Sequence, residues 1–414
     1  MTKLGVRAQL ATALGGAAAT LSRWTGRGDG SVIGGRVGLT LEPALLSRLA
    51  ADRRLALVSG TNGKTTTTRL VAAALRDAGD VASNAFGANM PSGHVTALSQ
   101  GRDAPYAVLE VDEKYVPLVL EQTGASVVVL LNLSRDQMDR AAETWILAQR
   151  WRTALTDADT HVVANADDPL VAWSAGTAKQ VTWVAAGQRW RDDSWCCPEC
   201  GSHLLREEVH WQCDKCGLTR PEPSWWLDGP ATAAAAVDPR GRRWDLDLRL
   251  PGRVNRTNAL IALAAAAVFG ISVDRALPHL AEVASVAGRY TVVERDGREV
   301  RLLLAKNPAG WLEAFDVLEP APTPVLLSVN AQGPDGRDTS WLWDVDYRVL
   351  AGRPVFVTGE RRLDLAVRLE VDKVDFELVR DIDEAVERVP PGRLAVIANY
   401  TAFQAIRTSY GRAL

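Results

Sequence analysis

The segment 60–66, Gly-Thr-Asn-Gly-Lys-Thr-Thr, has the residue types and the order of a phosphate-binding loop. It follows the apolar run 55–60 and precedes a helical pattern that starts at Lys64. Backbone N–H groups of such a turn, with the positive end of the helix dipole, can surround a triphosphate. Lys64 would reach the outer phosphates and the Thr65 hydroxyl would bind Mg²⁺. Val58 stands where the longer G-x-x-x-x-G-K-T pattern has its first glycine, so the loop is a shortened form. The expected phosphate-binding residues are Gly60, Thr61, Asn62, Gly63, Lys64, Thr65 and Thr66.

Two Cys-x-x-Cys-Gly segments form the second chemical pattern, and twelve residues separate them. Each segment presents two thiolates on one turn, and together they offer four soft ligands for a tetrahedral Zn²⁺. Because the protein fills all four positions, the expected role is structural. A redox Cys-x-x-Cys pair or buried free thiols are the alternatives, and Cys196 is a spare cysteine. The predicted zinc ligands are Cys197, Cys200, Cys213 and Cys216.

Polar residues follow several apolar runs at the points where these runs end. Continuous apolar strands separated by helices, such as the helix expected over 143–155, predict a parallel sheet covered on both faces. Ligands of such sheets bind beyond the carboxyl ends of the strands. The runs are LALVSG (55–60), YAVLEVDE (106–113), SVVVLLNLS (126–134) and THVVANADDP (160–169).

The rest of the chain divides around a Trp-, Cys- and Pro-rich interruption at 190–230. After it, a strand at 246–250 is expected to lead into a long Ala-rich helix, and a second α/β series begins after about Gly288. The strands of that series are expected at 299–308, 324–330, 354–359 and 394–400. The predicted domains are a helical lead-in (1–50), an α/β nucleotide-binding domain (51–287) with the four-Cys ribbon inserted at 190–225, and a second α/β domain (288–414).

Composition limits the class of protein. The chain has 414 residues, which suggests two or three domains, and 47 Lys plus Arg balance 50 Asp plus Glu. This balance argues against a general nucleic-acid or membrane-surface binder, and the acidic residues of the Cys-rich segment argue against nucleic acid there too. No apolar run is long enough to span a membrane. The Ala-rich start (1–19) is interrupted by polar residues, so we expect a helix of a cytoplasmic protein rather than a secretory signal.

The loop resembles that of the Mur ligase superfamily, G-T-[NK]-G-K-T-[TS]. Further positions match this family in order. Glu110 resembles its Mg²⁺-binding Glu, and Asn258 resembles the Asn that meets the adenine. Arg289 resembles the Arg of the Gly-Arg pair that begins its C-terminal domain. The resemblance implies ATP and Mg²⁺ as ligands and an α/β fold of two Mur ligase-type domains. The other matching residues are Asn132, Asn165, Asp167, Asp168, Gly252 and Asn255.

Two departures from the family pattern concern metal and substrate. Gln137 stands at the position of a metal-binding His, and the helix expected over 143–155 has no lysine that could be carbamylated to hold a second Mg²⁺. About 55 residues precede the loop. That is too few for the family's UDP-sugar-binding domain, so the substrate is expected to be held differently.

The inserted four-Cys segment resembles one branch of this superfamily, the synthetase subunits of lipid II isoglutaminyl synthase. Lys306-Asn-Pro-Ala-Gly310 and the segment 335–344, DGRDTSWLWD, agree with that branch. The resemblance implies ATP-dependent amidation of the D-glutamate carboxylate of the lipid II stem peptide through an acyl phosphate. It also implies that the chain forms a heterodimer with a GatD-type class I glutamine amidotransferase, which supplies the ammonia. The protein is then expected to be cytoplasmic and to contact the membrane only through the lipid-linked substrate.

The same branch implies that one Asp of this chain completes the catalytic Cys–His pair of the partner. Asp344 is the first candidate because it ends the motif behind Trp341 and Trp343, and Asp346 and Asp338 are the alternatives. The catalytic residues proposed from the sequence are thus Asp344, Lys64 and Glu110. Two other functions remain open: a conventional Mur- or folylpolyglutamate-type amino-acid ligase, and a zinc-ribbon interaction protein whose phosphate loop only switches conformation.

Overall fold

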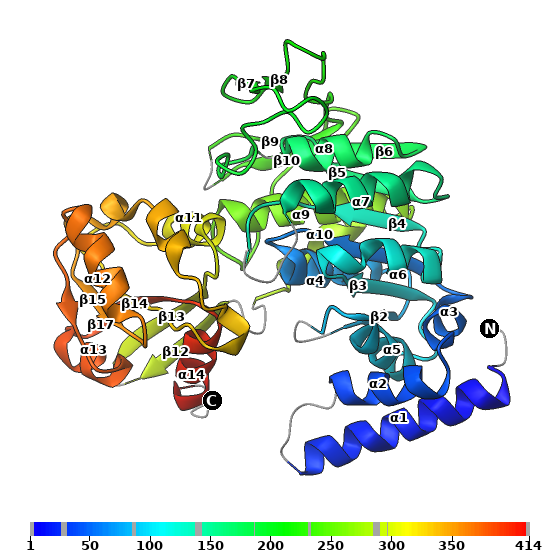
Figure 1. Cartoon of the computed structure of the whole chain (residues 1–414), viewed down its shortest axis with the longest axis horizontal. Helices are drawn as coiled ribbons and strands as arrows, with labels where there is room; N and C mark the ends of the chain where they lie inside the picture. Colours follow the sequence, from blue (N-terminus) through cyan, green and yellow to red (C-terminus); the bar gives the residue numbers. More distant parts are fainter. Residues whose placement is uncertain are drawn as a thin grey trace. The chain divides into compact units, whose positions relative to one another are not determined.

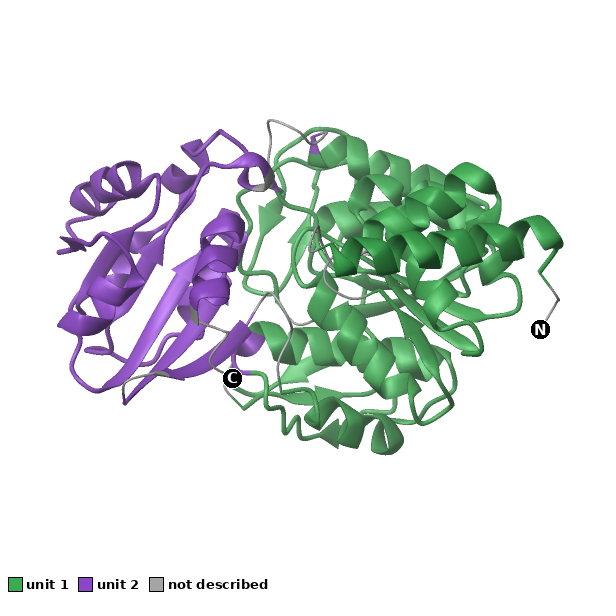
Figure 2. Ribbon diagram, turned by 90° about the horizontal axis from the view of Figure 1, so that it is seen from below, with its two compact units in different colours: residues 1–134, 144–250, 254–284 green, residues 135–143, 251–253, 285–414 purple. Residues whose placement is uncertain are grey.

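The computed structural model describes residues 4–25, 31–84, 88–136, 143–185, 187–230, 233–284, 290–295 and 297–410. These residues form two compact units, which Figure 2 shows in two colours. The first contains residues 1–134, 144–250 and 254–284, and the second contains residues 135–143, 251–253 and 285–414. The domain limits expected at 50/51 and 287/288 stay predictions.

The first unit contains a nine-stranded sheet in the order β11-β10-β9-β6-β5-β4-β1-β3-β2 (Figure 1). Every pair from β2 to β9 is parallel, and β10 and β11 are antiparallel. The strands are β1 (Arg54–Ser59), β2 (Val81–Ser83), β3 (Tyr106–Glu110), β4 (Val127–Leu130), β5 (His161–Asn165), β6 (Gln180–Ala185), β9 (Trp225–Asp228), β10 (Ala235–Val237) and β11 (Arg243–Trp244). The parallel part, built from continuous buried runs, confirms the expected sheet, whereas its antiparallel edge was not expected.

The strand expected at 246–250 is absent, because this segment is not paired with β11. Leu246 and Leu250 are buried, but the Leu246 carbonyl accepts a hydrogen bond from Arg256 Nη1 (2.9 Å) instead of a ladder partner. The same Nη1 atom donates to the Ala234 carbonyl (3.1 Å). The Arg256 side chain therefore satisfies a backbone carbonyl of the segment that was expected to form a strand.

The helices of the first unit form the expected N-terminal lead-in and cover the sheet. The helix expected over 143–155 is confirmed as α7. The helices are α1 (Val6–Trp24), α2 (Ser31–Leu41), α3 (Leu45–Ala50), α4 (Lys64–Leu75), α5 (Pro91–Gln100), the 3₁₀ turn η1 (Glu113–Tyr115), α6 (Val116–Thr123), α7 (Thr144–Thr156), α8 (Pro169–Ala175), α9 (Arg253–Val268, with its first residue in the second unit) and α10 (Val273–Ala281). No described helix is both long enough and apolar enough to cross a bilayer.

The Cys-rich insertion contains a separate two-stranded sheet of β7 (Leu205–Arg206) and β8 (Trp211–Gln212). It packs on the end of β5 and on α8 through a small buried cluster of Ala172, Cys197, Leu204, Trp211 and Cys213. The indole N–H of Trp211 donates to the Ala166 carbonyl (3.1 Å), and Arg220 Nε donates to Asp167 (2.8 Å). The insertion is thus fixed to the sheet by both apolar packing and buried polar contacts.

The second unit contains a six-stranded sheet in the order β12-β13-β17-β14-β15-β16, with only β12 antiparallel to its neighbour. Its core lies on both faces of the sheet and includes fully buried Trp311, Tyr347 and Phe403. The strands are β12 (Tyr290–Arg295), β13 (Arg298–Leu304), β14 (Val325–Ser328), β15 (Val355–Thr358), β16 (Glu377–Leu378) and β17 (Gly392–Ala398). The helices are α11 (Pro308–Asp316), η2 (Gly333–Asp335), η3 (Ser340–Asp344), η4 (Tyr347–Leu350), α12 (Arg362–Val371), α13 (Ile382–Arg388) and α14 (Tyr400–Tyr410).

Candidate functional site

The phosphate loop lies at the carboxyl end of β1, which runs between β3 and β4 in the sheet. Gly60 and Gly63 both have positive φ angles (144° and 84°) that favour glycine. A Cβ atom on Gly60 would lie 2.8 Å from the Leu131 Cβ, so the loop also needs glycine for space. Helix α4 begins at Lys64 directly behind this turn. The sequence therefore fixes a strand, a tight turn and a helix N-terminus, which is the expected geometry.

Asn132 and Ser134, which follow β4, brace the loop. Asn132 Oδ1 accepts the Asn62 N–H (2.9 Å), and Asn132 Nδ2 donates to the Asn62 carbonyl (3.0 Å). The Thr61 hydroxyl donates to the Ser134 carbonyl (3.1 Å) and accepts the Ser134 N–H (3.0 Å). Asn132 therefore holds the backbone of the loop in place through both ends of its side-chain amide.

Lys64 is buried at the base of the loop with its side chain only 4% exposed. Its ammonium donates to the carbonyls of Gly60 (2.6 Å) and Thr61 (3.2 Å) and to Glu113 Oε1 (3.0 Å). Glu113 lies in η1, just beyond the end of β3. This ion pair is a contact that the sequence analysis missed, although Glu113 stands in the same LEVDE segment as Glu110.

Glu110 ends β3 with its side chain 1% exposed. Its backbone is held by the Asn84 side chain, which accepts the Glu110 N–H (2.8 Å) and donates to its carbonyl (2.9 Å). Both carboxylate oxygens are buried and have no hydrogen-bond partner among the described residues. A buried carboxylate in that state is unfavourable unless a cation neutralises it. The donor set therefore fits a hard cation such as Mg²⁺.

A neighbouring buried histidine, His94, contacts the same strand end. His94 Nε2 lies 2.8 Å from the Glu110 carbonyl, and His94 Nδ1 has no partner among the described residues. Burial lowers the pKa of His94 to about 4. The imidazole is therefore neutral at neutral pH.

Asn258 of α9 lies against the start of α4. Its Oδ1 accepts a hydrogen bond from the Thr67 hydroxyl (3.2 Å), and a Cβ atom on Gly63 would lie 2.9 Å from that oxygen. Thr65 is half-buried and Thr66 is buried. The expected role of Asn258 toward the adenine stays a prediction. Arg289 and Gln137 lie outside the described residues.

The Asp residues of the NADDP segment have structural partners. Asp168 caps α8 by accepting the N–H groups of Leu170 (2.9 Å) and Val171 (3.2 Å), and its other oxygen accepts the Leu133 N–H (2.9 Å). Full burial raises the pKa of Asp168 to about 6. Asp167 accepts hydrogen bonds from the Gly187 N–H (2.7 Å) and Arg220. Asp168 therefore fixes the start of α8 next to the segment after β4, and Asp167 holds the Cys-rich insertion at the carboxyl end of β5.

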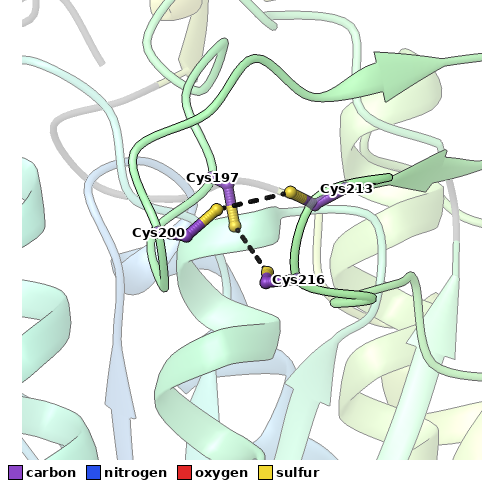
Figure 3. A group of neighbouring side chains, drawn as sticks. All are labelled: Cys197, Cys200, Cys213 and Cys216. Carbon is purple, nitrogen blue, oxygen red and sulfur yellow. Dashed lines mark hydrogen bonds between the residues drawn. The ribbon is translucent and has the colours of Figure 1, made fainter.

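The four predicted zinc ligands come together from the two Cys-x-x-Cys turns (Figure 3). All four sulfur atoms lie within 4.8 Å of one another. The Cys197–Cys216 and Cys200–Cys213 sulfur pairs are each 3.5 Å apart. Burial raises the pKa of the Cys197 thiol to about 12, whereas hydrogen bonds from Ser202 lower that of Cys200 to about 6. The cluster can hold a metal ion, and Cys196 is exposed and outside it.

Asp344 lies at the end of η3 in the second unit, where its carboxylate is 36% exposed and 3.3 Å from Arg135 Nη2. The alternative residues, Asp346 and Asp338, each bond a residue two positions further along the chain. Asp346 forms a two-point ion pair with Arg348 (2.8 and 2.7 Å), which lowers the pKa of Asp346. Asp338 accepts hydrogen bonds from the Ser340 N–H (2.8 Å) and hydroxyl (3.0 Å). In the same unit, Lys306 of the KNPAG segment pairs with Asp136.

Comparisons with known proteins bear on this arrangement. The Mur ligase middle domain family matches residues 58–203, and the MurT ligase C-terminal family matches residues 304–403. The MurT subunit of the glutamine-hydrolyzing lipid II isoglutaminyl synthase of Staphylococcus aureus (strain COL) is 28% identical over 400 residues, which are 90% of this chain and 91% of that protein. The subunit of the same name from Streptococcus pneumoniae (strain ATCC BAA-255 / R6) is 29% identical over 416 residues, 92% of each protein. The chain is thus similar to MurT subunits over about nine-tenths of its length.

A solved structure agrees with this similarity at the level of the fold. The MurF ligase of Thermotoga maritima in complex with ADP has a TM-score of 0.65 and 17% sequence identity, over 90% of this chain and 82% of that one. The relatives named MurT and the MurT ligase C-terminal match, rather than this structure, confirm the branch predicted from the Cys-rich insertion and the segment 335–344. The Mur ligase domains of the chain indicate an ATP-dependent ligase, and the solved structure shows that its fold is that of the Mur ligases.

Proposed function

We propose that this chain is the synthetase subunit of a glutamine-hydrolysing lipid II isoglutaminyl synthase, as its relatives are named. It would convert the D-glutamate carboxylate of the lipid II stem peptide to the amide of D-isoglutamine, on the cytoplasmic side of the plasma membrane. The observation that carries the proposal is the phosphate loop with buried Lys64, with the buried carboxylate of Glu110 on the neighbouring strand β3.

The chemistry is activation of a carboxylate by ATP. A carboxylate oxygen attacks the γ-phosphorus and the bond to the β-phosphate oxygen breaks, which gives an acyl phosphate and ADP. Ammonia then attacks the acyl carbon and phosphate leaves. Such a transfer depends on positioning and charge neutralisation, which the amides of 60–66 and the Lys64 ammonium supply. Asn258 and Arg289 are the proposed contacts to the nucleoside.

Mg²⁺ would be held by Thr65 and Glu110, and it supplies neutralisation of phosphate charge when bound. The support is the unpartnered state of both Glu110 oxygens among the described residues. Glu113 acts through Lys64 as a positioning residue. Its carboxylate, 14% exposed, keeps the ammonium at the base of the loop.

Zn²⁺ is the proposed ion of the four-cysteine cluster. Zinc–sulfur bonds of about 2.3 Å in a tetrahedron place the sulfur atoms about 3.8 Å apart. This is close to the 3.5 Å of the Cys197–Cys216 and Cys200–Cys213 pairs. The protein supplies all four ligands, so the role is structural. Because Cys197 and Cys213 belong to the apolar cluster on α8, the metal would lock the insertion to the sheet edge.

The proposed partner is a GatD-type class I glutamine amidotransferase subunit, which docks on the second unit. The word subunit in the names of the relatives implies a partner. Leu363, Val367 and Val371 of α12 are 62%, 49% and 56% exposed, and Trp343 beside Asp344 is 58% exposed. An exposed apolar stripe with a Trp is typical of a protein interface. Asp344 is the residue that would orient the partner's catalytic His, with Asp346 and Asp338 as alternatives.

An amidation assay without the partner tests the function of this chain alone. The purified chain is incubated with lipid II, ATP, Mg²⁺ and an ammonium salt, and the released stem peptide is analysed by mass spectrometry. The proposal predicts an amide on D-glutamate and one ADP per amide. Attachment of a whole amino acid would instead identify a conventional Mur- or folylpolyglutamate-type ligase, and ATP turnover without a modified peptide would indicate a nucleotide switch.

A further inference from the structure

Helix α1 places its large apolar side chains on the outside of the protein. Val6, Leu10, Leu14, Leu21 and Trp24 are 74%, 58%, 51%, 57% and 84% exposed. At about 100° per residue these five positions fall within an arc of about 80°. They therefore form one continuous stripe along the helix, which we call the α1 stripe.

The opposite face of α1 packs through small residues. Ala8, Ala11, Gly15 and Ala19 are buried. A Cβ atom on Gly15 would lie 2.6 Å from the Gly34 carbonyl oxygen of α2, and one on Gly34 would lie 2.8 Å from the Gly15 carbonyl oxygen. The close backbone approach fixes α1 on α2 and leaves the α1 stripe outward. This inverts the usual pattern, in which the large apolar residues of a surface helix face the core.

Charge selects the occupant of the α1 stripe. Residues 1–28 contain four basic residues and no Asp or Glu. In α1, Arg7 lies beside the stripe with its side chain 71% exposed; its Nε donates to the Leu41 carbonyl (2.8 Å) and lies 3.9 Å from the Glu42 carboxylate. Arg23 lies at the last turn of the helix. An exposed apolar stripe flanked by arginines, with Trp at one end, is the pattern of a helix that lies in the interface of an anionic membrane. The adjoining α2 adds Val32 and Ile33, which are 43% and 47% exposed.

We propose that α1 is a peripheral membrane-docking helix that inserts the α1 stripe among the acyl chains of an anionic bilayer. The choice of a membrane rather than a second protein rests in part on the proposed function, because the substrate is lipid-linked and lies in that membrane. Within the first unit, Figure 1 shows α1 on the far side of α2 from α5 and the sheet. Arg7 and Arg23 would contact lipid headgroups while the stripe enters the apolar layer.

Vesicle sedimentation tests the docking helix without substrate, so it can fail independently of the amidation activity. The full chain is mixed with vesicles of equal parts phosphatidylglycerol and phosphatidylcholine, or of phosphatidylcholine alone. The proposal predicts binding that is stronger on the anionic vesicles and falls with added salt. A variant with Val6→Gln, Leu10→Gln and Leu14→Gln should bind the anionic vesicles about tenfold or more weakly.

The matched control changes the exposed stripe of α12, with Leu363→Gln, Val367→Gln and Val371→Gln. These residues have the same i, i+4, i+8 spacing and similar exposure, and the control should bind vesicles like the wild type. Circular dichroism checks that both variants are folded. Absence of wild-type vesicle binding, or equal loss in both variants, overturns the proposal. Self-association of the wild type that the α1 variant abolishes would overturn it too, in favour of a second copy of the chain.

Discussion

Replacing Glu110 by Gln should stabilise the metal-free protein while it removes the stabilisation by Mg²⁺ and ATP. The carboxylate is buried at the end of β3, and neither oxygen has a partner among the described residues. An uncompensated buried charge destabilises a fold by about 3–5 kcal/mol. Gln keeps the size of the side chain but is neutral, and an unsatisfied buried amide costs about 1–3 kcal/mol. The difference predicts a gain of about 2 kcal/mol in the free energy of unfolding without metal.

Ligand binding should reverse this order. With Mg²⁺ and ATP at about 100 times their dissociation constant, the wild type gains about 2.7 kcal/mol. The variant, without the metal-binding carboxylate, should gain almost nothing. With both ligands, the free energy of unfolding of the wild type then exceeds that of the variant by about 0.7 kcal/mol. The variant is therefore the more stable protein without metal, and the wild type is the more stable one with Mg²⁺ and ATP.

Urea unfolding followed by tryptophan fluorescence measures both values, once with a chelator and once with Mg²⁺ and ATP. Glu121→Gln, which changes an exposed carboxylate on α6, is the control and should follow the wild type under both conditions. The reasoning is refuted if Glu110→Gln is less stable than the wild type in chelator, or if Mg²⁺ and ATP stabilise it as much as the wild type.

Four further predictions concern the other residues. Lys64→Ala should lower the rate of ammonia-dependent amidation about several hundredfold and leave partner binding intact, whereas exposed Lys114→Ala should amidate normally. Metal analysis should find one zinc per chain in the wild type and none in Cys200→Ser, and this variant should have a free energy of unfolding lower by about 3 kcal/mol or more. Cys196→Ser should change neither value. Asp344→Asn should reduce glutamine hydrolysis by the complex about ten-thousandfold, with amidation restored by an ammonium salt; normal glutamine use would move the role to another Asp. His94 is neutral in the fold with a pKa of about 4 and binds a proton on unfolding below about pH 6.5. Its contribution to stability is therefore lost as pH falls from 6.5 to about 4, by about 3 kcal/mol, and His94→Gln should remove that loss in unfolding measurements across this range.

The phosphate loop and the four-cysteine cluster were predictable because their constraints are local. Gly60 and Gly63 are needed for positive φ angles within one turn, and Lys64 opens the next helix, so neighbouring residues specify the whole element. Each Cys-x-x-Cys turn likewise orients its own two sulfur atoms. The two turns come together only in the folded protein. This was still predictable, because four cysteine thiols can bind one metal ion together.

The contact of Lys64 with Glu113 was not predictable, because it joins residues 49 positions apart. Three acidic residues stand in the segment 110–113, and nothing in their types says which faces the loop. The structure separates them by position: Glu110 ends β3, whereas Glu113 starts η1. Roles in this segment depend on where the strand stops, which is the least certain part of any pattern.

In the segment 246–250 and in helix α1, tertiary contacts give a result that the sequence pattern alone does not predict. Arg256 takes the Leu246 carbonyl that a strand would have paired. In α1 the helix was expected, but its large apolar residues would ordinarily mark the core face. The close approach of Gly15 to Gly34 instead buries the small residues and turns the large ones outward. Neither outcome follows from the hydrophobic pattern of the segment itself.

Transfer of isotope from amide-labelled glutamine to lipid II tests the central claim most directly. The chain and its glutaminase partner are incubated with lipid II, ATP, Mg²⁺ and glutamine labelled at the side-chain amide nitrogen. We predict that the label appears in the carboxamide of D-isoglutamine, that it requires both subunits and ATP, and that unlabelled ammonium ions in the solution dilute it little. An unlabelled product, or a product that carries a whole amino acid, would contradict the assignment of this chain as the amidating subunit.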